Sequence, residues 1–212
     1  MAFLYPSPTV ATYAPIIEKY SAKYKVPVEV IANTIYRESS GNPKAWNPSL
    51  GENSRGLMQI SEATATSTLG IKTADLPRLN EPDFNIERGT WYLARIYGIL
   101  LPIMGSMKET DRWMVVTSSY NQGTWYWQNA IKTLISEGKV LDFPIIQARV
   151  LAPVNTTRMP WRDNVLNYAA KIFSKVTSLE ISSSTIAGIG VGVVVVAGVF
   201  TWYYLSSTGK TA

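Results

Sequence analysis

The chain has 212 residues, 46% hydrophobic and 17% charged, which is enough apolar material for one packed core and argues against disorder over the whole length. Its 20 Lys and Arg against 15 Asp and Glu give a net charge of +5, without the dense basic runs typical of nucleic-acid binding, so we expect no nucleic-acid partner. The absence of His and Cys excludes Ser-His-Asp and Cys-His catalysis, His-ligated zinc and disulfides; we expect no metal and no cofactor, and carboxylates and hydroxyls remain as catalytic groups.

The N-terminal segment MAFLYPSPTVATYAP does not resemble a secretory signal peptide. It lacks a basic region, and Pro6, Pro8 and Pro15 interrupt it. We therefore expect another route across a membrane, if the protein crosses one.

The hydrophobic periodicity that follows is helical nearly throughout. Apolar residues recur at helical spacing from Val10 to Tyr24, and Pro27 is well placed as the first residue of a helix that runs to Glu38. After a loop rich in Gly, Asn, Pro and Ser over 39–55, the further helical stretches are 62–69, 84–101, 110–120, 124–137 and 161–176. No alternating run is long enough for a sheet core. The sequence thus predicts a compact, mainly α domain over residues 1–180.

The composition changes sharply near Glu180. Residues 181–185 are a short Ser-rich hinge, 186–205 are an uncharged apolar run and 206–212 a polar tail. As a helix, the run would cover about 30 Å, the thickness of a bilayer core, so we predict a single C-terminal transmembrane helix that contacts lipid. The aromatic residues 202–204 fit a membrane interface. A buried core helix is the alternative.

Glu38 is the first candidate for chemistry because it ends an apolar helix and meets the turn Ser39-Ser40-Gly41-Asn42-Pro43. A carboxyl group there, walled by apolar side chains, should be partly desolvated, so its pKa should rise and it could act as a general acid. A surface Glu near a helix end is the competing interpretation from this segment alone.

Three later segments could complete a site. Arg55-Gly56-Leu57-Met58-Gln59-Ile60 contains a Gly that permits close backbone approach and an amide that could bind a sugar. The segment around Phe84-Asn85-Ile86 and Trp91-Tyr92-Leu93 fits helix packing better than substrate contact. Ser118-Ser119-Tyr120-Asn121-Gln122-Gly123, followed by Trp125, Tyr126 and Trp127, places aromatic rings beside amides, as in a carbohydrate groove.

Four short motifs occur in order in ESSGNPKAWNPSLGENSRGLMQI, DFNIERGTWYL and SSYNQG: ES-x-x-NP, GLMQ, N-I-x-x-G and YN-x-G. With them the chain resembles the soluble lytic transglycosylase family, which has a lysozyme-like domain, from about Val10 to Lys175. The resemblance implies cleavage of peptidoglycan glycan strands between N-acetylmuramic acid and N-acetylglucosamine, with formation of a 1,6-anhydro ring. It also implies that Glu38 serves as both acid and base.

The same resemblance implies roles for other residues. Gln59 and Asn121 would hold acetamido or hydroxyl groups, Tyr120 would lie close to Glu38 or the sugar, and Met58 would line the groove. Ser39, next to Glu38, is a further substrate-binding candidate. Two departures from the family pattern give weaker candidates: Arg55, which would add positive potential to the cleft, and Asp163, which could equally be an acid at a helix N-terminus.

Glu52 and Glu62 are the acids nearest to the motif segments, and they bear on the reaction. Most glycosidases use two carboxylates, so a Glu52 that positions water would make the enzyme a lysozyme-type hydrolase. Solvent exposure is the alternative for Glu52. Glu62 follows Ser61, a good N-cap, and is expected to stabilise the first turn of a helix.

Other classes of function remain open from the sequence. The chain could be an inactive peptidoglycan-binding membrane protein, or a membrane-active protein that depends on its tail alone. For the enzyme, we expect a phage virion with an internal membrane, action in the host periplasm and contact with other virion membrane proteins. The bacterial inner membrane is the alternative location.

Overall fold

The computed structural model describes residues 5–48, 53–105 and 107–150, together with two strands at 191–196 and 199–204. Helices dominate the described part of residues 5–150, as the sequence predicts. The predicted helix at 161–176, and the candidate residues Glu52 and Asp163, lie outside the described residues.

The N-terminal part contains α1 (Pro8–Ala11), α2 (Ala14–Tyr24) and α3 (Val28–Ser39). The single helix predicted from Val10 to Tyr24 is wrong in its start, because Thr12 and Tyr13 separate two helices. Ser7 caps the first of them: its hydroxyl accepts a hydrogen bond from the Val10 N–H at 3.2 Å. Pro27 precedes α3 as its N-cap, close to the predicted helix start.

The loop after α3 is the least regular part of the described domain. It holds a two-residue ladder in which β1 (Trp46–Asn47) pairs antiparallel with β2 (Ser54–Arg55). The short α4 (Glu62–Ser67) follows, and then a 3-10 helix, η2 (Thr73–Asn80), which the sequence analysis did not predict. Ser61 caps α4 as expected, since its hydroxyl accepts from the Thr64 N–H at 3.1 Å.

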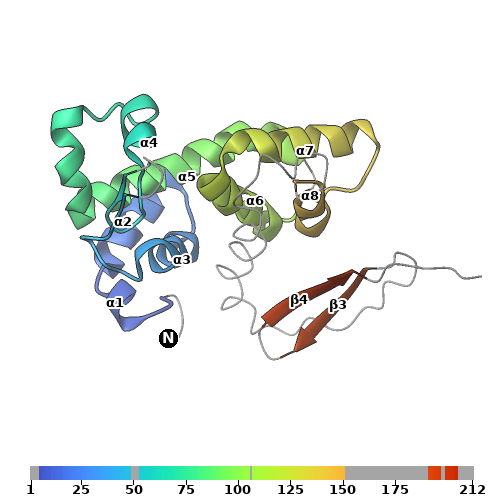
Figure 1. The fold of residues 1–212 in the computed structure, drawn as a ribbon, viewed down its shortest axis with the longest axis horizontal. Helices are drawn as coiled ribbons and strands as arrows, with labels where there is room; N and C mark the ends of the chain where they lie inside the picture. The colour runs from blue at the N-terminus through green and yellow to red at the C-terminus, as the bar shows by residue number, and fades with distance from the viewer. Residues whose placement is uncertain (1–4, 49–52, 106, 151–190, 197–198, 205–212) are drawn as a thin grey trace, which may run out of the picture.

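The longest helix is α5 (Pro82–Met104), which runs from the N-terminal group of helices to the C-terminal one (Figure 1). The C-terminal group consists of α6 (Glu109–Gln122), α7 (Thr124–Ser136) and α8 (Phe143–Val150). Apolar side chains from both groups and from α5 are buried together in one hydrophobic cluster, among them Ile31, Leu93 and Ile131. One helix therefore connects two groups of helices that share a core.

The apolar C-terminal run differs from its prediction. The described residues of this run form two antiparallel strands, β3 (Val191–Val196) and β4 (Val199–Tyr204), in place of a transmembrane helix. Their content of β-branched and aromatic residues favours strands, which apolar length alone does not reveal. Among the residues that the structure describes, no helix combines the length and the apolar character that crossing a membrane requires.

Candidate active site

Glu38 is the penultimate residue of α3, and the local sequence sets its position. The buried side chains of Ile31 and Ile35 fix the rotation of α3 against the core. Ser40 then takes a left-handed conformation (φ 54°) and ends the helix. The chain turns away at Ser40, which leaves the partly buried side chain of Glu38 at the junction of loop and core.

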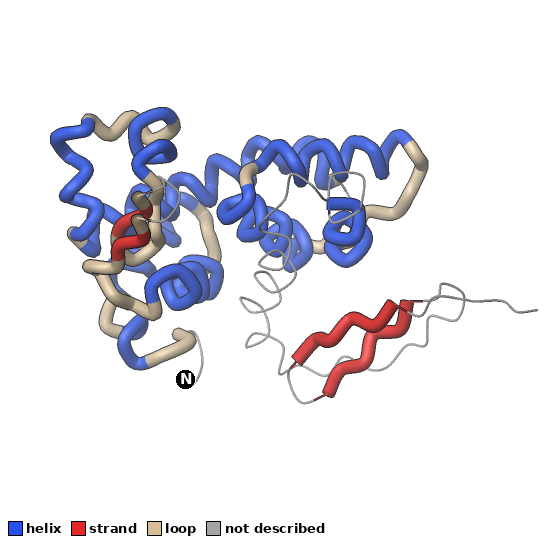
Figure 2. The backbone as a smooth tube through the Cα atoms, in the orientation of Figure 1, coloured by secondary structure: helices blue, strands red, loops and turns tan. Residues whose placement is uncertain are grey.

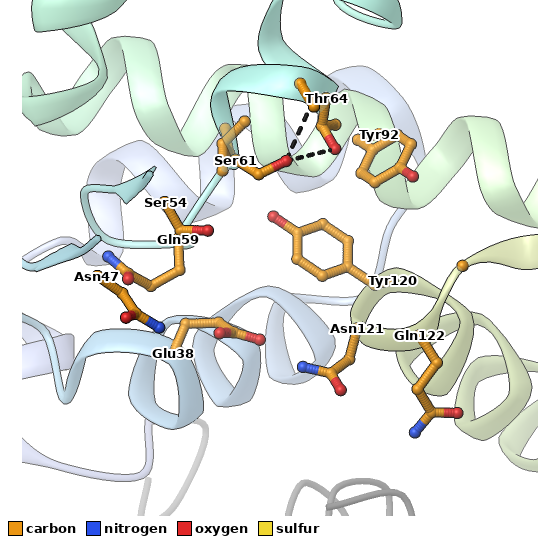
Figure 3. A pocket seen from close by; sticks show the side chains of 13 residues that line it. Glu38, Asn47, Ser54, Gln59, Ser61, Thr64, Tyr92, Tyr120, Asn121 and Gln122 are labelled. Carbon is orange, nitrogen blue, oxygen red and sulfur yellow. Dashed lines mark hydrogen bonds between the residues drawn. The ribbon is translucent and has the colours of Figure 1, made fainter. Parts of the chain in front are cut away.

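A pocket of about 480 Å³ opens at Glu38. Figure 3 shows the carboxyl group of Glu38 directed into this space, with Asn47 and Gln59 on one side and Tyr120 and Asn121 on the other. The residues that line the pocket are Glu38, Asn47, Ser54, Gln59, Ile60, Ser61, Ala63, Thr64, Tyr92, Tyr120, Asn121, Gln122 and Gly123. Among the described lining residues, Glu38 is the only carboxylic acid, and amides and hydroxyls surround it.

The turn over residues 55–60 forms one wall, and side chains from α5 and α3 bind its backbone. Asn85, fully buried in α5, accepts from the Met58 N–H at 2.8 Å and donates to the Arg55 carbonyl at 3.1 Å. Ser39, next to Glu38, donates to the Leu57 carbonyl at 2.7 Å. The position of the acid is thereby coupled to the position of the turn.

Gly56 has to be glycine for this arrangement. Its φ is +76°, and a Cβ at this position would lie 2.0 Å from the Leu79 carbonyl oxygen and 2.3 Å from the Asn85 amide nitrogen. The close backbone approach expected from the sequence therefore serves the packing of the turn against η2 and α5.

Tyr120 forms part of the opposite wall of the pocket and also binds the turn at residues 55–60. Its hydroxyl donates to the Met58 carbonyl at 2.8 Å, and its ring lies 5.3 Å from the ring of Tyr92, centroid to centroid. Burial raises the pKa of Tyr120 well above its ordinary value of 10, and the charge of the Glu38 carboxylate and then Tyr92 add to the rise. Tyr120 therefore stays protonated and keeps donating. Tyr120 and Glu38 both line this pocket.

Gln59 and Asn121 both face the pocket. Gln59 is in the left-handed region (φ 46°), and its amide nitrogen donates to the carbonyls of Ala45 at 3.0 Å and Gly56 at 2.9 Å. These bonds orient the amide and leave its oxygen as the acceptor for a ligand. Asn121 is exposed at the end of α6.

Two candidates are not among the residues that line the pocket. The Met58 side chain is fully buried and packs against Gly89, where a Cβ would lie 2.3 Å from its sulfur. The expectation that Met58 lines the groove is wrong for this reason. Ser39 is likewise absent from the lining residues, because its hydroxyl is directed to the carbonyls of Ile35 and Leu57.

Arg55 is also turned away from the pocket. In the β1–β2 ladder, Asn47 pairs with Ser54, and both line the pocket, whereas Trp46 pairs with Arg55 on the opposite face. Arg55 binds Glu62 there at 2.9 Å, and its guanidinium lies 5.7 Å from the centre of the Trp46 ring. Glu62 is in the first turn of α4, as expected, and anchors this arginine.

Sequence reasoning missed several lining residues, above all Tyr92, which was assigned to helix packing. Gly89, one turn earlier on the same face of α5, is the signal that could have indicated it, since a helical glycine admits a close neighbour. Asn47, Ser54 and Thr64 come from loop and short-helix positions where periodicity carries no information. In the described ranges, no group of three acidic side chains could hold a metal ion.

The fold and the pocket together define a mainly helical domain with a pocket rich in amides and hydroxyls, in which Glu38 is the only carboxylic acid among the described lining residues. The sequence profile of the Transglycosylase SLT domain family matches residues 15–140, and the chain belongs to this family.

Known lytic transglycosylases are similar to this chain in sequence or in fold, in agreement with this assignment. The membrane-bound lytic murein transglycosylases C of Yersinia pestis and Yersinia pseudotuberculosis are each 34% identical to the chain over 116 residues, which is 52% of this chain. The match spans 31% of the length of those relatives. An inactive mutant of the lytic transglycosylase Slt from Pseudomonas aeruginosa has a similar fold, with a TM-score of 0.51 and 20% identity over 79% of this chain and 25% of that one.

Proposed function

We propose that the protein is a peptidoglycan lytic transglycosylase that cleaves the β-1,4 bond between N-acetylmuramic acid and N-acetylglucosamine. The observation that carries the proposal is the position of Glu38 as the only carboxylic acid among the described residues of an amide-rich pocket. Membership of the Transglycosylase SLT domain family supports it. The murein transglycosylases of Yersinia, similar over part of their length, support the same substrate.

In this reaction Glu38 acts twice. As an acid it gives its proton to the glycosidic oxygen while the bond from that oxygen to muramic acid C1 breaks. As a carboxylate it then takes the proton of the muramic C6 hydroxyl while O6 bonds to C1. The products are a 1,6-anhydro end and a free sugar hydroxyl, Glu38 is protonated again, and no water is consumed.

The rest of the pocket would orient the strand for this step. Gln59 and Asn121, on opposite sides of Glu38 in Figure 3, are placed to bind acetamido or hydroxyl groups of neighbouring sugars. Tyr120, whose hydroxyl is committed to the Met58 carbonyl, would present the edge of its ring beside Glu38.

The test is digestion of purified sacculi followed by mass spectrometry of the products. We expect anhydro-muramic ends from the wild type and a loss of activity of at least a hundredfold in Glu38→Gln. Glu29→Gln is the matched control, since Glu29 is in the same helix but does not line the pocket. Equal cleavage by wild type and Glu38→Gln would contradict the catalytic role of Glu38, and no cleavage by either protein would leave only a peptidoglycan-binding role.

The competing reaction is hydrolysis of the lysozyme type, in which Glu52 would position water. Its neighbours in the chain, Asn47 and Ser54, both line the pocket, which makes Glu52 the acid to test. We expect Glu52→Gln to keep the anhydro product. Reducing-end muramic acid from the wild type, lost in Glu52→Gln, would establish hydrolysis instead.

We also propose that the apolar run at 186–205 brings the enzyme to a lipid bilayer. Its 20 uncharged residues, ending near Trp202, Tyr203 and Tyr204, support this proposal. The full chain should float with vesicles of phosphatidylethanolamine and phosphatidylglycerol, and a Val194→Asp/Val195→Asp variant should not. Val140→Asp, at a position that is 73% exposed, is the control. Wild-type protein that stays out of the vesicle fraction would contradict membrane contact.

For the biological setting, we propose a phage particle in which the enzyme opens the host wall locally while the genome enters, beside other membrane proteins of the particle. The combination of a small domain of the transglycosylase family with an apolar C-terminal run supports it. Purified particles that lack the protein would contradict this proposal and favour the bacterial inner membrane.

A further inference from the structure

Trp125 is a large aromatic side chain beside the pocket that the catalytic arrangement does not use. It is 64% exposed and is the second residue of α7, two residues after Gly123, which lines the pocket together with Asn121 and Gln122. Trp127, two residues later in the same helix, is fully buried. The difference in exposure indicates that the two rings serve different purposes.

The buried Trp127 fixes the rotation of α7. Its indole N–H donates to the Gln122 side-chain oxygen at 2.8 Å, and its ring stacks on Phe143 with centroids 5.7 Å apart. Residues two apart in a helix differ by about 200° around the axis, so Trp125 lies on the side opposite to Trp127. It is therefore held away from the core.

The helix also directs Trp125 along its axis. Side chains of an α-helix lean toward the N-terminus, and the N-cap of α7 is Gly123, which lines the pocket. Tyr126 meets the Trp125 ring edge-on, at 85° with centroids 5.0 Å apart. This contact restrains the indole without stacking on it in parallel, so a flat ligand can still reach the ring.

We propose that Trp125 stacks on a sugar ring of the bound strand, outside the two sugars whose bond Glu38 cleaves, on the side of the pocket formed by Asn121 and Gly123. The C–H face of a pyranose ring is apolar and flat, and an exposed indole is a matching surface. Figure 3 places Asn121 and Gln122 together on this side of Glu38. The inference rests on the proposed function, because it takes a glycan as the ligand, and it makes long strands better ligands than short fragments.

Binding without turnover tests the proposal. Full-length Glu38→Gln protein is titrated calorimetrically with the disaccharide and the hexasaccharide of β-1,4-linked N-acetylglucosamine. Adding Trp125→Ala should weaken hexasaccharide binding about tenfold, which corresponds to about 1.4 kcal/mol, and leave disaccharide binding unchanged. Trp125→Phe should retain part of the affinity.

Trp46→Ala is the matched control. Trp46 is 59% exposed, similar to Trp125, but it pairs with Arg55 on the face of the β1–β2 ladder opposite to the pocket residues Asn47 and Ser54. Its removal should leave binding of both oligosaccharides unchanged. An equal loss in the two tryptophan variants would show a non-specific effect and overturn the proposal.

Other outcomes are equally decisive. Unchanged hexasaccharide binding in Trp125→Ala, an equal loss for both ligands, or no binding by the parent protein would each overturn the stacking role. The proposed function is judged separately, from the lytic activity of the wild type on sacculi against that of Glu38→Gln. A lytic wild type with unchanged hexasaccharide binding in Trp125→Ala would therefore refute the stacking role alone.

Discussion

Side chains from three helices hold the backbone of the turn at 55–60. Ser39 of α3 binds the Leu57 carbonyl, Asn85 of α5 binds Met58 N–H, and Tyr120 of α6 binds the Met58 carbonyl. Buried backbone groups that lose such partners are costly, so the turn has little freedom to move. Because Ser39 is adjacent to Glu38, this network sets the distance between the acid and the amide of Gln59.

Asn85→Ala tests how much this network contributes. The change leaves the Met58 N–H and the carbonyls of Arg55 and Leu79 without their partner in a buried place, so we expect a loss of about 3 kcal/mol in the free energy of unfolding. Urea unfolding measures it. Asn80→Ala, at an exposed position of η2, should change stability by less than about 0.5 kcal/mol. Equal stability of the two variants would show that the turn does not depend on Asn85.

Part of the pocket could be predicted from individual residues and their short motifs. The residues Glu38, Gln59, Tyr120 and Asn121 were expected together, and the structure brings them to one pocket, because each belongs to a short motif that is informative without long-range contacts. Tyr92 was missed because it reaches the pocket through a contact between distant parts of the chain, in which its ring lies 5.3 Å from the ring of Tyr120 in α6. Local sequence does not encode that contact.

Helices were predictable where an apolar face recurs over several turns. The expected stretches 84–101, 110–120 and 124–137 correspond to α5, α6 and α7 within a few residues at each end. The break before α2 was missed because the apolar spacing continues across it, and η2 because Pro77 lies inside it. For the apolar C-terminal run, length favoured a helix while β-branched composition favoured strands, and hydrophobicity alone could not separate them.

Two ion pairs join α2 to α5 and give a prediction at the scale of elements. Lys19 binds Asp83 at 3.0 Å and Lys23 binds Glu87 at 2.7 Å, while the hydroxyls of Tyr20 and Tyr24 donate to the same carboxylates. The hydrogen bond from Lys23 lowers the pKa of Glu87 below its ordinary value of 4.5. A carboxyl group whose pKa is lower in the folded state than in the unfolded state stabilises the fold at pH values above the unfolded pKa. This stabilisation is lost as the pH falls through the folded pKa.

Glu87→Gln should therefore destabilise the protein near neutral pH and lose its effect in acid. We expect a small loss in the free energy of unfolding at pH 7, because Lys23 is half exposed, and a difference from wild type that shrinks as the pH falls below 4.5. Urea unfolding across this pH range measures it. Glu81→Gln, which removes an exposed pair with Arg78, should have no measurable effect. A difference that does not depend on pH would contradict the role of the ion pair.

At the scale of the whole molecule, the pocket spans the two groups of helices that α5 connects. Glu38, Gln59 and Ser61 come from the N-terminal group, and Tyr120 and Asn121 from the C-terminal group (Figures 1 and 3). A ligand that fills the pocket would therefore contact both groups at once. Such binding stabilises the folded chain as a unit, because the unfolded chain has no assembled pocket.

The melting temperature of the full-length Glu38→Gln protein should accordingly rise with the hexasaccharide of N-acetylglucosamine. At a ligand concentration of about 100 times Kd, the stabilisation is about 2.7 kcal/mol, which raises the melting temperature by roughly 5 to 10 °C in a chain of this size. Asn121→Ala should reduce the rise, since Asn121 lines the pocket, and Asn129→Ala in α7 should not. A melting temperature that stays constant up to saturating ligand would mean that the pocket does not bind glycan across both groups of helices.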